Sequence, residues 1–309
     1  MKKRIKIFVC FCVVLIFFTV ALGDGLAKCP VRMGSLYIPD HFSVIARAGS
    51  VSEFPENTLP AFQEALDIDG ANALAVDLFL TRDGKVILWR AWNNPGARRP
   101  IEKFKPSGPS SKVPAFQDFM DWATQQNKLK LVLFKLRIPA HESSLATILL
   151  EEIRRVMDDI SPAPRFQFVF LTPHKEILNR VKNQFKDFSF SYDREIPSVE
   201  IINYHSYTTV PNAMEFKNSF ASIGFPNRNR LSVPLAPDAW DIYKFILTLD
   251  FKIRDNYKRS TSNYIKIISW AFNDESKMRC LIHLGVDGIV TNNPKLLRKI
   301  ALDMGKVLD

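Results

Sequence analysis

The chain has 309 residues, of which 42 are Lys or Arg and 32 are Asp or Glu, so its formal net charge is +10. Apolar residues make up 47% of it, and Gly and Pro are few, which excludes a disordered or collagen-like protein. The length suits one large domain or two small ones, and it is ample for a sizeable core. The charge favours a nucleic acid or an anionic membrane as partner only if the basic residues lie in the folded part of the chain.

The N-terminus holds four of these basic residues. Lys2, Lys3, Arg4 and Lys6 precede an uncharged apolar stretch at 7–22. This pattern predicts a signal peptide over residues 1–23, because the apolar stretch is short for a membrane-spanning helix, which needs about 20 residues. An uncleaved membrane anchor is the alternative. We therefore expect an exported protein, periplasmic or extracellular, or one anchored by residues 7–22.

The rest of the chain divides into a leader at 24–40 and one domain at 41–309. Without the export segment, 38 basic residues stand against 32 acidic ones, which is ordinary for a domain of this size. No motif interleaves aromatic and basic residues, so a nucleic acid is not expected as partner. Cys29 and Cys280 are the only cysteines outside the export segment, which excludes a disulfide framework. Whether these two pair in an oxidising compartment stays open.

Strand-like and helix-like segments alternate along the domain. Strands are predicted at 42–46, 73–80, 129–136, 166–171, 188–192, 220–224, 264–271 and 288–291. Helices are predicted at 58–66, 114–125, 145–156, 174–182, 238–249 and 274–284, and from 294 onward. Residues 86–89 form a hairpin arm after an Asp-Gly turn. Eight β/α units match a (β/α)₈ barrel, which typically needs about 250 residues. A doubly wound sheet is the alternative, but no Gly-rich phosphate loop follows the first strand.

Several short motifs follow one another in a familiar order. They are Ala-Arg-Ala-Gly at 46–49, Pro-Glu-Asn-Thr at 55–58, Ala-Val-Asp at 75–77, Thr-Arg-Asp-Gly at 81–84, Ile-Ser-Trp at 268–270 and Gly-Val-Asp-Gly-Ile-Val-Thr at 285–291. This order resembles the glycerophosphodiester phosphodiesterase family over about residues 41–301. The resemblance implies a TIM barrel of the phospholipase-C-like phosphodiesterase type. It also implies a role in lipid and glycerophosphodiester metabolism.

The resemblance implies a metal-dependent phosphodiester hydrolase. Carboxylates of such an enzyme hold Ca²⁺ or Mg²⁺ against the phosphodiester, and two histidines act as general acid and base. The arginine after the first histidine binds phosphate oxygens. In this chain the retained motif positions are Arg47 and Asp77. We expect Arg47, Glu56 and Trp270 to bind substrate, and Asp77 to be the one metal ligand left.

The chain departs from the family at most reactive positions. Ala46 replaces the first histidine, Ala75 the glutamate, Arg90 the second histidine, and Lys135 the acid at the end of the third barrel strand. One carboxylate is a poor site for a hard divalent ion, which takes several oxygen ligands. We therefore expect a lost metal site, no cofactor, and a pseudoenzyme or a strongly impaired hydrolase.

Three further readings follow from the charged residues. Lys135 and Arg90 near Asp77 could replace the metal's charge, either as an ion pair that fills the pocket or as a site for a glycerophosphodiester or phospholipid headgroup. Asp193 and Glu195 follow a strand and could restore hydrolysis together with Asp77. A non-catalytic binder of an anionic membrane surface is the third reading, through the basic loop residues Arg98, Arg99, Lys103, Lys105 and Lys112.

Overall fold

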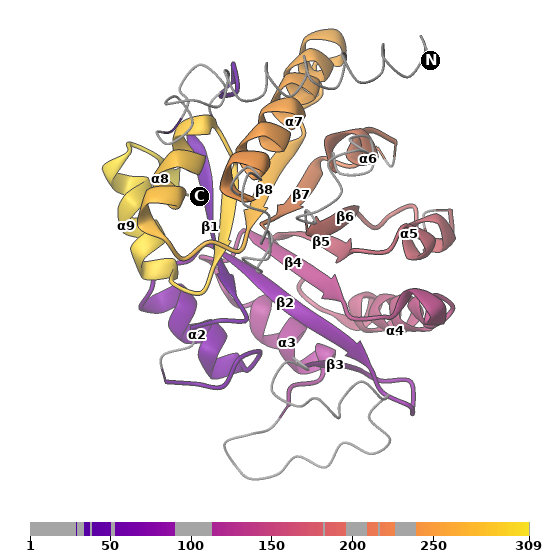
Figure 1. Ribbon diagram of the computed structural model, residues 1–309. Coiled ribbons are helices and arrows are strands. Elements are labelled where there is room, and N and C mark those ends of the chain that lie inside the picture. The colour runs from indigo at the N-terminus through magenta and orange to yellow at the C-terminus, as the bar shows by residue number, and fades with distance from the viewer. Residues whose placement is uncertain are drawn as a thin grey trace, which may run out of the picture.

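The computed structural model describes residues 29, 34–37, 39–50, 53–89, 113–181, 183–195, 209–215, 217–225 and 239–308, and the statements below concern these residues. Parallel strands form a closed ring of eight (Figure 1): β1 (His41–Arg47), β2 (Ala73–Leu80), β4 (Leu131–Leu136), β5 (Gln167–Thr172), β6 (Phe190–Glu195), β7 (Phe220–Gly224), β8 (Lys266–Trp270) and β9 (Gly288–Thr291). Each pairs with the next in this order, and β9 pairs with β1. The prediction of a (β/α)₈ barrel is confirmed.

Two short strands lie outside the ring. β3 (Val86–Leu88) pairs antiparallel with the end of β2, as the Asp-Gly turn predicted. β10 (Val307–Leu308) pairs with the first residues of β1 and thus lies at the end of the barrel where the strands begin. We call this end the base of the barrel, and the end where the strands finish the mouth.

Helices surround the ring: α2 (Leu59–Asp67), α3 (Phe116–Ala123), the 3₁₀ turn η3 (Ala140–Glu142), α4 (Leu145–Asp159), α5 (Lys175–Val181), α6 (Thr209–Glu215), α7 (Ala239–Thr261), α8 (Glu275–Leu284) and α9 (Pro294–Asp303). Local chemistry sets their ends. Thr58 caps α2, Asp274 accepts the Lys277 N–H at 2.9 Å, and Gly285 ends α8 at φ +98°. Among the described helices, none is long and apolar enough to cross a membrane.

Two helices differ from the sequence expectation. α7 continues to Thr261, although the apolar pattern predicted an end at 249. Its second half buries Phe251 but also Arg254 and Asp255. In a sequence, charged residues such as these two indicate an exposed segment. α6 was not predicted; it has only seven residues, and Pro211 lies in its first turn.

The alternation of side chains along the strands separates two layers of core. Phe42, Val44 and Ala46 of β1 belong to the large cluster between ring and helices. Ile45, Ala73, Ala75, Leu131 and Leu133 belong to a smaller cluster inside the barrel. Because strand side chains repeat with period two, Arg47, Asp77 and Lys135 fall on the inner face at the mouth.

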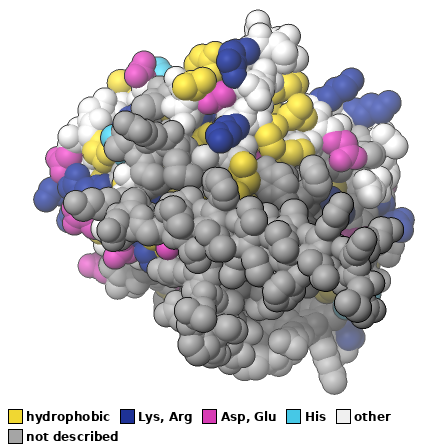
Figure 2. All heavy atoms as spheres, turned by 45° about the horizontal axis from the view of Figure 1, so that its top comes forward, with side chains coloured by type: hydrophobic (Ala, Val, Ile, Leu, Met, Phe, Trp, Pro, Cys, Tyr) yellow, Lys and Arg dark blue, Asp and Glu magenta, His cyan; other side chains and the backbone are white. Residues whose placement is uncertain are grey.

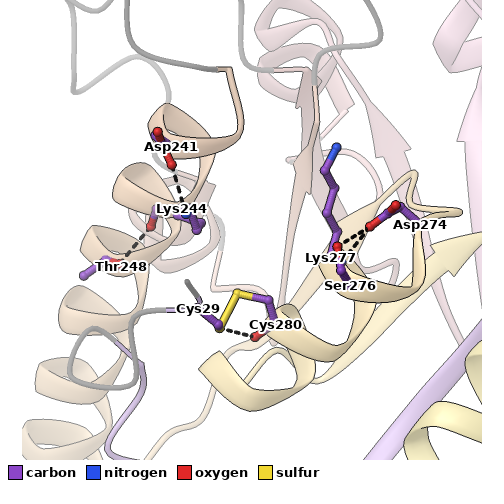
Figure 3. The surroundings of a disulfide bond; sticks show 8 residues. All are labelled: Cys29, Asp241, Lys244, Thr248, Asp274, Ser276, Lys277 and Cys280. Carbon is purple, nitrogen blue, oxygen red and sulfur yellow. Dashed lines mark hydrogen bonds and ion pairs between the residues drawn. A yellow bond between two sulfur atoms is a disulfide. The ribbon is translucent and has the colours of Figure 1, made fainter. Parts of the chain in front are cut away.

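The leader is joined to the barrel at two places. Cys29 forms a disulfide with Cys280 of α8 (Figure 3), which answers the question that the sequence left open. Ser35 and the backbone N–H of Leu36 donate to the carboxylate of Asp255, at 3.0 and 2.8 Å. These contacts hold the leader against α7 and α8 as the chain approaches β1.

Candidate functional site

The mouth carries an ion pair between Asp77 of β2 and Arg137, the residue after β4. The Nε and Nη2 atoms of Arg137 lie 2.8 and 2.6 Å from Oδ1 of Asp77. Asp77 is buried, whereas the Arg137 side chain is 31% exposed. An arginine fork has five N–H donors, so Arg137 keeps donors for another anion while it holds Asp77.

Sequence analysis did not single out Arg137. The sequence did contain a sign of it. Arg137 follows Lys135 by two residues, and side chains two positions apart along a strand point to the same face, here the inner one. The register pairs Asp77 with Lys135, so β2 and β4 bring an acid and a base to the same level of the barrel. The sequence predicted this neighbourhood of Lys135 and Asp77, and it missed the arginine that binds the carboxylate.

Lys135 reaches across the mouth to Trp270. Its Nζ atom lies 4.1 Å from the centroid of the Trp270 ring, at the end of β8. In the ring of eight strands, β4 and β8 are four positions apart and therefore lie on opposite sides. The Lys135 ammonium and the Trp270 ring therefore meet inside the ring of strands, between β4 and β8. Such a contact of a cation with an indole face is attractive.

A glycine positions Trp270. A Cβ atom at Gly224 of β7 would lie only 2.5 Å from the indole ring, so the ring rests directly on the β7 backbone. Gly224 and Trp270 are partners in the register of β7 and β8. The indole therefore has a fixed place beneath the Lys135 ammonium. Sequence analysis named Trp270 as substrate-binding, and the structure brings it to the mouth.

Two side chains near Asp77 and Lys135 have a buried N–H group without a hydrogen-bond acceptor among the described residues. These groups are Nδ2 of Asn57 and Nε1 of Trp270. Asn57 is 1% exposed, adopts φ +59°, and accepts the backbone N–H of Asp77 through Oδ1 at 3.2 Å. A buried donor without an acceptor costs free energy. A ligand rich in acceptor oxygens would satisfy both donors.

The other predicted substrate residues also lie near this end. Arg47 is half-buried and pairs in register with Ala75, and Glu56 is half-buried in the loop before α2. Ala75 is buried on the inner face. Ala46 lies in the outer cluster, so a histidine introduced there would first meet the helices rather than the barrel interior.

Several predicted residues lie outside the described parts of the structure. These are Arg90, the basic loop residues Arg98, Arg99, Lys103, Lys105 and Lys112, and the export segment 1–23. The backbone of Asp193 and Glu195 lies in β6, where Asp193 pairs in register with Ser222, while their side chains are outside the description. Their proposed roles stay predictions.

The described residues of the mouth do not fit a divalent metal. Within the described ranges, no group of three or more His, Cys, Asp or Glu side chains could hold an ion. Asp77 binds a guanidinium, and Ala75 offers no oxygen ligand. The Lys135 ammonium at the mouth repels a second cation. The arrangement instead favours an anion with several acceptor oxygens.

Hydrogen bonds and burial shift the pKa values of two side chains near the mouth. Asp274 lies in the loop after β8, and its pKa is lowered by the Ser276 hydroxyl and the Lys277 backbone N–H. Beneath the rim, burial raises the pKa of Tyr243, whose hydroxyl donates to the Ile223 carbonyl at 3.1 Å. Asp274 therefore carries its charge at neutral pH and serves α8 as a cap.

Comparison with known proteins agrees with this geometry. Residues 48–89 match the model of the glycerophosphoryl diester phosphodiesterase family. An uncharacterized Bacillus subtilis protein, YqiK, is 20% identical over 278 residues, which is 82% of this chain and 95% of that protein.

Solved structures share the fold. A candidate glycerophosphoryl diester phosphodiesterase from Silicibacter pomeroyi is 18% identical, with a TM-score of 0.63 and coverage of 90% of this chain and 98% of its own. A glycerophosphodiester phosphodiesterase from Parabacteroides distasonis is 15% identical, with a TM-score of 0.61 and coverage of 86% and 99%. An Oleispira antarctica phosphodiesterase, solved with the product sn-glycerol-3-phosphate, is 16% identical, with a TM-score of 0.57 and coverage of 86% and 97%.

The closed ring of parallel strands and these neighbours define a TIM barrel of the phosphodiesterase type. The family model covers the segment from the end of β1 to the β2–β3 hairpin, which includes Asn57 and Asp77 of the mouth. The match of residues 48–89 to the family model and the shared fold agree with the resemblance to the glycerophosphodiester phosphodiesterase family that the motifs predicted.

Proposed function

We propose that this protein binds a phosphate ester of the glycerophosphodiester or glycerol phosphate class at the barrel mouth without a divalent metal, and hydrolyses it weakly or not at all. One observation carries the proposal: the Lys135 ammonium lies 4.1 Å from the Trp270 ring, inside the ring of strands, while Arg137 binds the carboxylate of Asp77. Fixed protein cations supply the positive charge that a metal ion supplies in the family.

The mouth matches a phosphate in charge and in hydrogen bonding. Arg137 keeps free donors, Arg47 lies two strands away on the inner face, and Asn57 and Trp270 each hold a buried N–H without a described acceptor. Hydrogen bonds between such groups and phosphate oxygens are among the stronger ones in proteins. The complex of the Oleispira antarctica phosphodiesterase with sn-glycerol-3-phosphate supports this ligand class.

Weak hydrolysis follows from the residues that remain. Ala75, on the inner face, cannot transfer a proton, and the carboxylate of Asp77 is bound by the Arg137 guanidinium. Catalysis by Asp77 together with Asp193 and Glu195 is the alternative proposal. Turnover of glycerophosphocholine in the presence of calcium or magnesium would favour that alternative.

We also propose that the protein acts outside the cytoplasm. The pattern of residues 1–23 predicts export, and the disulfide between Cys29 and Cys280 is the kind of bond that persists in an oxidising compartment. The bond ties the leader to α8. A fusion of the export segment to a periplasmic reporter tests the export signal itself.

Titration calorimetry with sn-glycerol 3-phosphate in a chelating buffer tests the ligand proposal. We expect the wild type to bind, and Lys135→Met and Arg137→Gln each to weaken binding by about 10-fold to 100-fold, because a charge-assisted hydrogen bond contributes about 1.5–3 kcal/mol. Lys128→Met is the control, since Lys128 lies on the surface and pairs with Asp67 at 2.9 Å. Equal affinity of all four proteins, with each variant shown to be folded by its thermal melt, would refute the assignment of these residues.

A further inference from the structure

We propose that the base of the barrel is a membrane-facing surface that rests on the phospholipid headgroups of a bilayer, so that the mouth points away from the membrane. The proposal does not depend on which ligand the mouth binds. It rests on the exposed apolar side chains at the base, on a hollow lined by lysine and tyrosine, and on the path of the leader.

Four of the six large apolar side chains that are exposed in the described structure lie at the base. They are Leu36 (72% exposed), Ile68 (68%), Leu302 (45%) and Val307 (52%). Ile68 follows the end of α2, Leu302 lies in the last turn of α9, and Val307 pairs with His41 at the start of β1. All three positions surround the beginning of β1, because α2 and α9 both run from the mouth to the base.

Backbone contacts bring together the elements that carry these side chains. The Val307 N–H donates to the Asp40 carbonyl at 2.9 Å, and the turn after α2 touches α9, where a Cβ at Gly70 would meet Arg298. Scattered apolar side chains on a surface need no explanation, whereas a group of them at one end marks an interaction site. The exposed Phe54 and Ile148 lie elsewhere, in the loop before α2 and on α4.

A hollow of about 610 Å³ opens beside this group. Its walls include Leu36, Tyr37, Lys258, Tyr264 and Lys266. The Nζ atom of Lys258 lies 3.8 Å from the Tyr37 ring centroid and 4.9 Å from that of Tyr264. Tyrosine and lysine are suited to a membrane interface, because each has an apolar body and a polar tip.

The charges around the hollow leave Lys258 the more available of the two lysines to phosphate. Lys258 contacts two tyrosine rings, whereas Lys266 lies close enough to Asp287 to act on its pKa, and the acids of the wall also have other partners. Asp287 accepts from Arg254, Tyr264 and the Ile267 N–H, and Lys306 lies near Asp40. Figure 2 turns the end of α7 toward the viewer and shows hydrophobic and basic side chains side by side in its upper part.

The leader connects this surface to the apolar stretch of the sequence. Ser35 and Leu36 are bound to Asp255 at the base, and Cys29 is bound to Cys280. From residue 22, where the apolar stretch ends, to Cys29 the chain can extend about 24 Å at most. If residues 7–22 enter a bilayer, the bilayer surface lies within that reach of α8, near the end where Leu36 is exposed.

The test measures which end of the barrel faces the lipid. The full chain, with Cys10 and Cys12 replaced by Ser, is reconstituted into vesicles of phosphatidylcholine and phosphatidylglycerol. A single cysteine that carries an environment-sensitive dye replaces Leu302 or Val307 at the base, or Phe54 or Ile148 as controls away from it. We expect a blue-shifted emission and protection from iodide at 302 and 307, and full iodide access at 54 and 148.

A charge reversal provides the second readout. Lys258→Glu together with Lys266→Glu should remove the protection at 302 and 307, while Lys175→Glu together with Lys295→Glu should leave it, because these lysines lie in the first turns of α5 and α9 at the mouth end. Equal iodide access at all four labelled positions would overturn the proposal. Protection at 54 with access at 302 would overturn it as well, since the mouth would then face the membrane.

Discussion

The two ends of the barrel differ in how their buried charged and polar groups are paired, although one buried donor at the base, Nδ2 of Asn218, also lacks a described acceptor. At the base, Arg254 is fully buried and donates to Asp287 at 3.0 Å and to Ser35, while Asp287 also accepts from Tyr264 at 2.8 Å and from the Ile267 N–H at 2.8 Å. At the mouth, Asn57 and Trp270 keep buried donors that no described residue satisfies. A satisfied network holds a fold together, and unsatisfied donors mark a place that a ligand completes. The charged network around Arg254 therefore stabilises the fold, and the donors of Asn57 and Trp270 are available to a ligand at the mouth.

The largest expected effect comes from the arginine of the base. Arg254→Met leaves Asp255 and Asp287 buried without their cation, and we expect a loss of about 3–5 kcal/mol in the free energy of unfolding, or about 10 °C in melting temperature. Lys252→Met, at an exposed position of the same helix, is the control. If the free energy of unfolding of Arg254→Met lay within about 1 kcal/mol of the wild-type value, the network at the base would add nothing to stability.

The disulfide should rank next. The disulfide encloses almost the whole domain in one loop, and Cys29→Ser together with Cys280→Ser removes it. We expect a loss of about 2–4 kcal/mol in the free energy of unfolding, measured by urea unfolding. A reductant should destabilise the wild type by the same amount and leave the double variant unchanged. If reductant shifts both proteins equally, the stabilisation does not come from this bond.

A pH effect should follow from Asp250, which α7 buries beside the start of α6. Burial raises its pKa to about 7, although the N–H groups of Thr209 and Val210 donate to it. The folded state then binds a proton more tightly than the unfolded state, so stability is present at low pH and falls as the pH rises toward 7. Between about pH 5 and about pH 8 the wild type should lose about 2–3 kcal/mol that Asp250→Asn does not lose.

Urea unfolding of both proteins at the two pH values provides the measurement. An equal change in the two proteins would assign the pH dependence to other groups, of which Asp287 is the first candidate, because burial also raises its pKa.

The smallest expected effect lies at the mouth end. Asp274→Ala removes the cap of α8 and should cost about 1 kcal/mol, measured by thermal melting. Ser276→Ala removes a hydroxyl that donates to Asp274 at 2.6 Å but leaves the cap itself, and should cost less. A cost of Asp274→Ala as large as that of Arg254→Met would break the contrast between the two ends.

The sequence predicted the barrel because its signals are local. Strand alternation, the caps at Thr58 and Asp274, and the stop at Gly285 each depend on residues a few positions apart. The long-range contacts could not be read in this way. Arg137 binds an acid 60 positions away, and Arg254 binds one 33 positions away, so neither partner was visible from spacing. The same buried charges hid the second half of α7.

The site was predicted in part. The sequence predicted that Lys135, Asp77 and Trp270 lie at the mouth, because the family motifs place each of them at the end of a barrel strand. It could not show that Lys135 meets Trp270 inside the ring, since that contact depends on β4 and β8 standing opposite one another in the ring. Nor could it show the donors of Asn57 and Trp270 without acceptors, which only the packed structure reveals.

The metal dependence of ligand binding tests the central claim most directly. Titration of the full chain with sn-glycerol 3-phosphate is carried out in a chelating buffer and again with calcium or magnesium added, and glycerophosphocholine turnover is followed under the same two conditions. The account predicts the same affinity in both buffers and negligible turnover, because Lys135 and Arg137 supply the charge. Binding that appears only with the metal, accompanied by turnover, would contradict it.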